Sequence, residues 1–241
     1  MKINRVTVSG ASDDVDILDI LNFSTLIPCV EWGILLSKSQ SGNGRFPTIK
    51  WIQTLDSINM ITGNHVHLSG HLCGKWMRDF VGGTNSFREE NHKLWQGFER
   101  IQINIGSMPV QPELLAKSML EDIYKPYIIQ TNPTRDISLV HQLRNEFGLD
   151  VSCLFDASGG KGIETKDWPK PVEHVKCGYS GGLGGGVGEL AHKLGEINKV
   201  AGGIHIWIDA EGQLRTDDKL DLVKVKSYIF EALKWEYYGD K

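Results

Sequence analysis

Short β-rich runs alternate with amphipathic helical segments along the whole chain, and this alternation constrains the fold more than any other feature. The step from one run to the next is roughly 24 to 35 residues, which is the length of one strand-helix unit in an eightfold barrel. The runs are RVTVSG (5–10), VEWGILLS (30–37), HVHLSG (65–70), IQINIG (101–106), YIIQTN (127–132), VSCLFDAS (151–158), VKCGYSGG (175–182) and IHIWIDA (204–210).

Five of the segments between the runs carry apolar residues at helical spacing, at 13–27, 112–124, 138–148, 187–200 and 220–235. Strict alternation of strands and helices predicts a parallel sheet that is buried on both faces. Eight units of similar size predict that this sheet closes into a (β/α)8 barrel, the TIM-barrel fold, with the whole chain as a single domain. A doubly wound open sheet is the alternative.

Small or polar residues stand at the ends of most runs, and they are Ser9, Ser37, Ser69, Asn104, Thr131, Asn132, Asp156, Ser180 and Asp209. In a barrel of parallel strands the carboxyl ends meet at one edge, where active sites are built. We therefore expect the functional groups at that edge.

Many of the 27 glycines follow the sixth and seventh runs. After the seventh run, Gly181, Gly182, Gly184 and Gly185 lead into a predicted helix. Glycine amides approach an anion closely, and a helix N-terminus adds partial positive charge, so this turn predicts a phosphate site. The alternative is that these glycines only turn the chain.

Asp156 ends the apolar sixth run and is followed by the loop Gly159–Gly162. A carboxylate at the partly desolvated mouth of a barrel has a raised pKa, which suits a general acid or base. The alternative is an aspartate that caps the loop by accepting hydrogen bonds from its amides.

The third run and the residues that follow it, HVHLSGHLCGKW (65–76), carry His65, His67 and His71, with Cys73 close behind. If the strand stays regular, a period of two places the three histidines on one face around one strand end. Such a strand can bind a metal in a hydrolase or lyase, with Asp156, Asp209 and Glu211 as candidates for the further ligands. Barrel-interior histidines that are hydrogen-bonded to their neighbours are the interpretation we favour, and we expect no metal or organic cofactor.

Three segments, LFDASGGKGIETKDW, YSGGLGGGVGEL and WIDAEGQLRTDDKLDLVKVKSYI, together resemble phosphoribosylanthranilate isomerase in order and spacing. This resemblance implies a barrel that performs an Amadori rearrangement without a cofactor. It gives Asp156 the role of general acid, Arg45 that of a contact to a substrate carboxylate, and the turn at 181–186 that of a phosphate cradle. By position at the matching strand ends, Ser9 joins the catalytic candidates, and the candidates for substrate or phosphate contact include Asn104, Asp209, Glu211 and Gly212.

The chain departs from the family at three strand ends. The family's base is a cysteine where this chain has Ser9, so His71 or Cys73 is the candidate replacement, and a family histidine is replaced by Asn104. In the family a serine-rich turn binds phosphate after the eighth strand; here Asp209, Ala210, Glu211 and Gly212 stand there. A carboxylate beside a phosphate is unfavourable unless a cation lies between them.

The resulting prediction is an isomerase-like enzyme that acts on a small phosphorylated or polyhydroxylated sugar derivative by acid-base chemistry. A metal-dependent hydrolase or lyase on the same barrel and a non-catalytic ligand-binding barrel are the alternatives. The net charge of −4 and the lack of a basic tract argue against nucleic acid as a partner.

No apolar run approaches the ~20 residues of a membrane span, so we expect no membrane partner and a cytoplasmic location. The cysteines form no CxxC pair, which predicts free thiols. Apolar residues on the last predicted helix, including Tyr228 and Trp235, suit either the closure of the barrel or a homodimer contact.

Overall fold

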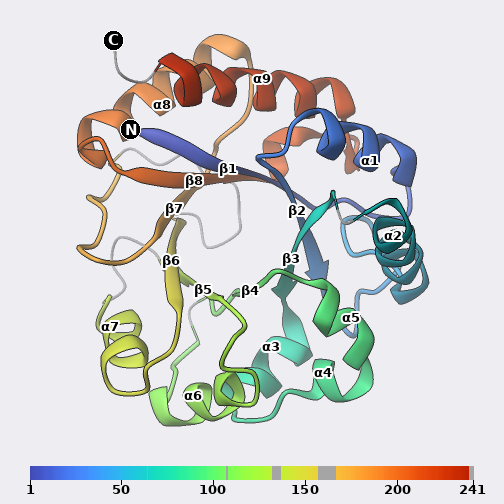
Figure 1. Ribbon diagram of the computed structural model, residues 1–241, viewed down its shortest axis with the longest axis vertical. Helices are drawn as coiled ribbons and strands as arrows, with labels where there is room; N and C mark the ends of the chain where they lie inside the picture. Colours follow the sequence, from blue (N-terminus) through green and yellow to red (C-terminus); the bar gives the residue numbers. More distant parts are fainter. Residues whose placement is uncertain (64, 107, 132–136, 157–166, 239–241) are drawn as a thin grey trace.

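The computed structural model describes residues 1–63, 65–106, 108–131, 137–156 and 167–238. Eight parallel strands form a closed barrel in chain order, and pairing of the first strand with the eighth completes it (Figure 1). The strands are β1 Lys2–Ser9, β2 Val30–Leu36, β3 His67–Leu72, β4 Arg100–Ile103, β5 Tyr127–Thr131, β6 Val151–Asp156, β7 Cys177–Ser180 and β8 His205–Ala210. The predicted (β/α)8 barrel is confirmed, and the open-sheet alternative is wrong.

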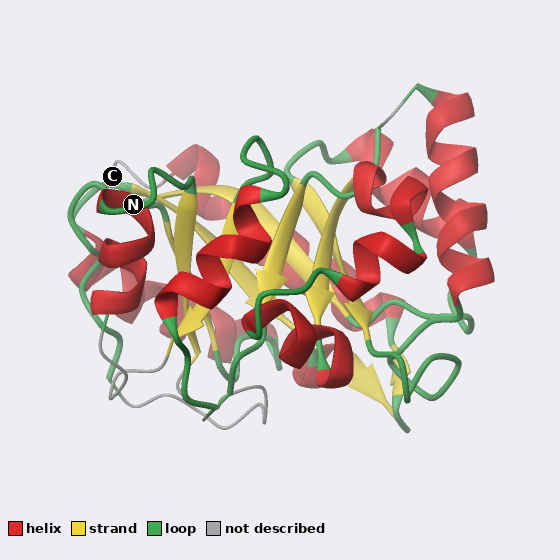
Figure 2. Ribbon diagram, turned by 90° about the horizontal axis from the view of Figure 1, so that it is seen from below, coloured by secondary structure: helices red, strands yellow, loops and turns green. Residues whose placement is uncertain are grey.

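Helices surround the barrel on its outer face (Figures 1 and 2). They are α1 Ile17–Leu26, α2 Ile49–Thr62, α3 Gly74–Val81, α4 Ser86–Glu90, α5 His92–Gly97, α6 Pro112–Leu120, α7 Ser138–Asn145, α8 Val187–Ala201 and α9 Leu222–Tyr238. The five predicted helical segments correspond to α1, α6, α7, α8 and α9, and the last two helices extend beyond their predicted ends. A short 3₁₀ turn, η1 Gly212–Leu214, and the hairpin of β9 Arg215–Thr216 and β10 Lys219–Leu220 lie between β8 and α9. Among the described helices, none combines the length and the apolar character that crossing a bilayer requires.

Local hydrogen bonds fix the loop that leads from β2 into α2. Thr48 is the N-cap of α2, and its hydroxyl accepts a hydrogen bond from the Trp51 amide at 3.1 Å. The Thr48 hydroxyl and amide in turn donate to the carboxylate of Asp13, at 2.6 and 2.7 Å. The loop is thereby tied to the segment that follows β1, and it carries Arg45 toward the carboxyl ends of the strands.

Apolar side chains fill the space between the barrel and its helices, and the barrel interior is more polar. Trp207, Ile128 and Leu154 form a separate apolar cluster. Gly178 on β7 makes room for the indole of Trp207, because a Cβ at that position would overlap the ring. The Arg100 guanidinium lies 4.7 Å from the centre of the same indole. This layer closes the interior below the carboxyl ends of the strands.

The third strand begins later than the sequence predicts. Strand β3 starts at His67, so Ser69 lies within the strand as a buried residue and is not at its end. The histidine near the carboxyl end of β3 is His71. The strand pairs β2 on one side and β4 on the other, which fixes this register: His71 lies opposite Leu35 and Gln102.

On α9, Tyr228 is buried and Trp235 is partly buried against the core. The expected apolar face of this helix is therefore used, at these two positions, to cover the barrel. A homodimer stays a prediction.

Candidate active site at the barrel mouth

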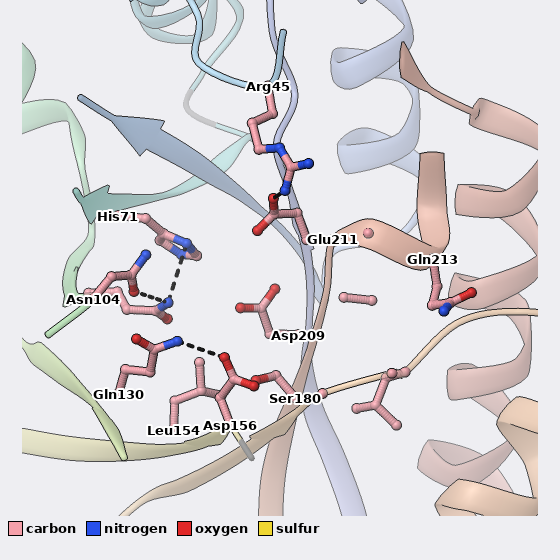
Figure 3. A pocket seen from close by; sticks show the side chains of 16 residues that line it. Arg45, His71, Asn104, Gln130, Leu154, Asp156, Ser180, Asp209, Glu211 and Gln213 are labelled. Carbon is pink, nitrogen blue, oxygen red and sulfur yellow. Dashed lines mark hydrogen bonds and ion pairs between the residues drawn. The ribbon is translucent and has the colours of Figure 1, made fainter. Parts of the chain in front are cut away.

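A pocket of about 150 Å³ opens at the carboxyl ends of the strands, and we call it the mouth pocket (Figure 3). Its lining comes from strands β3 to β8 and from the loops after β2, β4, β7 and β8. The lining residues are Arg45, His71, Gln102, Asn104, Gln130, Leu154, Asp156, Ser180, Gly181, Gly182, Leu183, Asp209, Ala210, Glu211, Gly212 and Gln213. Engineered protein cavities of about this volume admit a molecule of benzene size. The described residues thus leave room for one small ring.

Asp209, near the end of β8, is the most perturbed acid of the pocket. Burial, together with the neighbouring carboxylates of Glu211, Glu31 and Asp156, raises the pKa of Asp209 to about 8 against the hydrogen bond from Ser9. The Ser9 hydroxyl donates this bond to Oδ1 of Asp209 at 2.6 Å. Asp209 therefore holds a proton at neutral pH, and Ser9 fixes the orientation of its carboxyl group.

Asp156, the last residue of β6, points into the same pocket (Figure 3). It is 4% exposed, and its Oδ2 accepts a hydrogen bond from the Gln130 amide at 2.6 Å. Asp156 therefore lies at the mouth of the barrel, where its place in the sequence predicts it. The glycine-lysine loop that follows it lies outside the described residues, as does Asn132.

Glu211 and Arg45 form an ion pair across the top of the pocket (Figure 3). A second carboxylate, that of Asp218, lies 3.5 Å from the Arg45 guanidinium. Burial raises the pKa of Glu211, although Arg45 opposes this change. Arg45, expected to meet a substrate carboxylate, thus meets carboxylates of its own chain in this structure.

His71 lies deep in the pocket and is uncharged near neutral pH, because burial lowers its pKa to about 4. The Gln102 amide lies 3.4 Å from Nδ1 and also donates to Asn104 at 2.8 Å. A donor at Nδ1 assigns the ring hydrogen to Nε2, which is buried and has no partner among the described residues.

A glycine on β2 brings His71 close to Ser9. A Cβ at Gly33 would overlap the Ser9 hydroxyl and lie 2.9 Å from His71 Nε2. Without a side chain at this position, the two groups share the space above the β2 backbone. The imidazole, the hydroxyl and the carboxyl group of Asp209 therefore meet in one corner of the site.

Cys73, the other candidate for the missing base, does not line the mouth pocket. Burial raises the pKa of Cys73 to about 12, against the hydrogen bond that Asn104 donates to its sulfur at 3.3 Å. The thiol is protonated at neutral pH and lacks the thiolate that base catalysis needs.

The expected cluster of histidines at one end of the third strand is wrong. His67 contacts Glu99 near the amino-terminal end of β3, and His65 precedes the strand in an exposed position. His71 alone of the three reaches the mouth, because β3 runs the height of the barrel between them. Among the residues that the structure describes, no group of three or more His, Cys, Asp or Glu is arranged to hold a metal ion.

Only the first part of the glycine turn after β7 lines the pocket. Gly181 and Gly182 line the pocket, whereas Gly184 packs against Gln213 and Leu214. Gly181, Gly182, Gly184 and Gly185 all have φ between 74° and 114°, which is a conformation that favours glycine. The turn therefore needs these glycines for its backbone, and phosphate binding there stays a prediction.

Gln102 and Gln130 are pocket residues that the sequence analysis missed. Each interrupts a short apolar run of buried β-strand, and each lies on the alternate positions that face the barrel interior. A polar amide at an otherwise apolar strand position is the signal that identifies them. Gln213, on the short turn after β8, carries no such signal.

Together, the closed barrel and the polar pocket at the carboxyl ends of its strands place the chain among (β/α)8 barrels with a candidate site at the usual edge. No protein-family model and no curated protein sequence matches the chain.

Among solved structures, the chain is similar to monomers generated from the dimeric phosphoribosylanthranilate isomerase of Thermotoga maritima, with 13% identity, a TM-score of 0.58 and coverage of 96% of this chain and 99% of that one. It is also similar to the phosphoribosylanthranilate isomerase from Thermococcus kodakaraensis, with 11% identity, a TM-score of 0.54 and coverage of 95% and 98%. A Chromobacterium violaceum protein assigned to spore coat polysaccharide biosynthesis gives 11% identity, a TM-score of 0.52 and coverage of 95% and 74%. The expected resemblance is confirmed at the level of the fold.

Proposed function

We propose that the chain is an acid-base isomerase that moves a proton between neighbouring carbons of a small sugar derivative. The observation that carries this proposal is the pair of buried aspartates, Asp156 and Asp209, that enter one pocket from β6 and β8. The similarity to isomerase barrels agrees with it at the level of the fold.

The surroundings of the two aspartates suggest opposite roles. Asp209 is protonated at neutral pH because its pKa is raised to about 8, so it is the acid. With Asp209 as the acid, Asp156 takes the role of the base, and the Gln130 amide orients it by donating a hydrogen bond to its Oδ2. This assignment differs from the one that the family resemblance implies, in which Asp156 is the acid.

The proposed reaction is balanced without a co-reactant. Asp156 removes the proton from the carbon beside the carbonyl group of the open-chain sugar, while Asp209 protonates the carbonyl oxygen, which gives an enediol. Return of a proton from Asp156 to the former carbonyl carbon, and of a hydroxyl proton to Asp209, completes the isomerisation. Ser9 and His71 act as positioning and polarising groups, because Ser9 holds Asp209 and the His71 Nε2–H donor faces no other described partner.

Incorporation of deuterium from heavy water tests the proposal. Wild-type protein is incubated with a panel of aldoses, ketoses and their phosphates, and NMR follows exchange of the proton beside the carbonyl group. We expect Asp156→Asn and Asp209→Asn each to lower the exchange rate by roughly 10²- to 10⁴-fold, the usual contribution of a positioned acid or base.

Asp150→Asn is the matched control, because Asp150 directly precedes β6 at the opposite end of the barrel and its carboxylate forms exposed ion pairs, at 3.6 and 3.8 Å, among the described residues. Its exchange rate should equal that of the wild type. Full exchange in the Asp156→Asn protein would overturn the proposal. Binding without exchange across the whole panel would do the same and would favour a non-catalytic ligand-binding barrel.

A further inference from the structure

The mouth pocket contains more acids than cations. Three of its described lining residues are acidic, namely Asp156, Asp209 and Glu211, and Arg45 is the one lysine or arginine among them. Arg45 is already paired with Glu211 and lies 3.5 Å from Asp218. The imidazole of His71 adds no positive charge at neutral pH. The described lining therefore offers no unpaired cation to a ligand.

An acidic side chain also lies beside the turn that would hold an anion. Glu189, in the first turn of α8, places its carboxylate where a Cβ of Gly185 would stand. Lys193, one turn further along the helix, donates to the Gly182 carbonyl at 2.8 Å. The partial positive charge at the start of α8 is thus faced by a carboxylate of the chain itself.

Hydrogen-bonding groups in the pocket are mostly acceptors. The amide nitrogens of Gln102 and Gln130 are used by Asn104 and Asp156, at 2.8 and 2.6 Å, which leaves the amide oxygens as acceptors. The carboxylates add further acceptors. The buried Nε2–H of His71, with no partner among the described residues, is a donor aimed at the same space. Such a lining matches a ligand with several hydroxyl groups, each of which both donates and accepts.

We infer that the substrate is a single uncharged, polyhydroxylated sugar that carries no phosphate group. This inference rests on the proposed isomerase function and selects one of the two substrate classes that the sequence left open. A phosphate would meet the carboxylate of Glu211 in a partly desolvated site, where repulsion between like charges is strongest, and the exposed carboxylate of Glu189 lies beside the glycine turn. A monosaccharide is the class that matches the acceptor-rich lining and the volume of about 150 Å³.

Matched pairs of probes test the inference: D-ribose with D-ribose 5-phosphate, D-xylose with D-xylose 5-phosphate, and D-glucose with D-glucose 6-phosphate. Binding to wild-type protein is measured by ligand-observed NMR, and exchange of the proton beside the carbonyl group is measured in the same samples. We expect at least one free sugar to bind at least tenfold more tightly than its phosphate. Tighter binding of the phosphorylated member, or no binding of any free sugar, would overturn the inference. Binding of a free sugar without exchange would refute the proposed function alone.

Glu211→Gln gives a second test, with inorganic phosphate as the probe. Loss of the carboxylate releases Arg45 from its ion pair, so we expect phosphate affinity to rise at least fivefold. Glu196→Gln on α8 is the matched control, because Glu196 pairs with Lys199 on the same helix, at 2.6 Å, and does not line the pocket. Equal phosphate affinity in wild-type and Glu211→Gln proteins, with tight binding in both, would contradict the inference.

Discussion

In the lower layer of the barrel interior, near the amino-terminal ends of the strands, Glu31 is paired with the cation of Arg100. In the upper layer, near the carboxyl ends, Asp209 has no cationic partner among the described residues. Arg100 donates two hydrogen bonds to Glu31, both at 2.7 Å, and the Thr7 hydroxyl donates a third at 2.8 Å. Burial alone would raise the pKa of Glu31, but Arg100 outweighs it and lowers the pKa. Asp209 receives one hydrogen bond, from Ser9, and burial raises its pKa to about 8.

The difference in pKa separates a carboxylate with a structural role, Glu31, from a carboxyl group that is able to take part in proton transfer, Asp209. A buried carboxylate with a bidentate arginine stays ionised and makes no demand on a ligand. A buried carboxyl group surrounded by other acids keeps a proton near neutral pH and is able to donate it. The two layers of one barrel thus use a buried carboxyl group for opposite purposes.

Removal of the cation from the lower layer has the largest expected effect on stability. Arg100→Met leaves Glu31 as an unpaired buried charge, which costs roughly 3–5 kcal/mol. Urea unfolding at pH 7 measures the change in the free energy of unfolding. The double variant Glu31→Leu with Arg100→Met removes both charges and should recover much of the loss. A loss below about 1 kcal/mol in Arg100→Met would show that the pair is not needed.

A change in the upper layer should appear in the pH dependence of stability. Between pH 4 and 8 the folded state keeps the proton of Asp209 that the unfolded chain has released, so this group lowers the stability as the pH rises. Asp209→Asn removes this contribution. The free energy of unfolding of the variant, relative to the wild type, should therefore rise by on the order of 3 kcal/mol between pH 5 and pH 8.

Urea unfolding at several pH values measures this difference, and Asp150→Asn provides the control curve. Parallel curves for the Asp209→Asn and wild-type proteins would contradict a raised pKa. The lowered pKa of His71 makes the free energy of unfolding rise with pH below pH 6.5, which is the opposite of the effect of Asp209. Because His71 is present in both proteins, the difference between the variant and the wild type reports on Asp209.

The smallest expected effect is at Cys73. Because burial raises the pKa of this thiol to about 12, Cys73→Ala should lower the exchange rate by less than about threefold. The NMR exchange assay checks this result. A loss of about 100-fold would return Cys73 to the role of base and would remove Asp156 from it.

Sequence patterns predict the barrel well because each strand is a nearly continuous apolar run and each unit repeats with similar length. They also place Asp156 and Asp209 at the mouth, since both end such runs. The patterns do not predict partners that come from distant strands: Arg45 and Glu211 are 166 positions apart, and Ser9 and Asp209 are 200 apart. The histidines of the third strand do not gather at the mouth as the sequence pattern predicts. Strand β3 begins two residues later than its sequence run, at His67, so that only His71 of the three lies near its carboxyl end.

The most direct test of the account is the titration of Asp209 itself. Carbon-13 NMR of protein labelled at the aspartate carboxyl groups follows each resonance with pH, and Asp209→Asn assigns the signal. The account predicts a midpoint near 8 for Asp209. A midpoint near the ordinary aspartate value of about 4 would mean that Asp209 is ionised at neutral pH and is not the acid of the site.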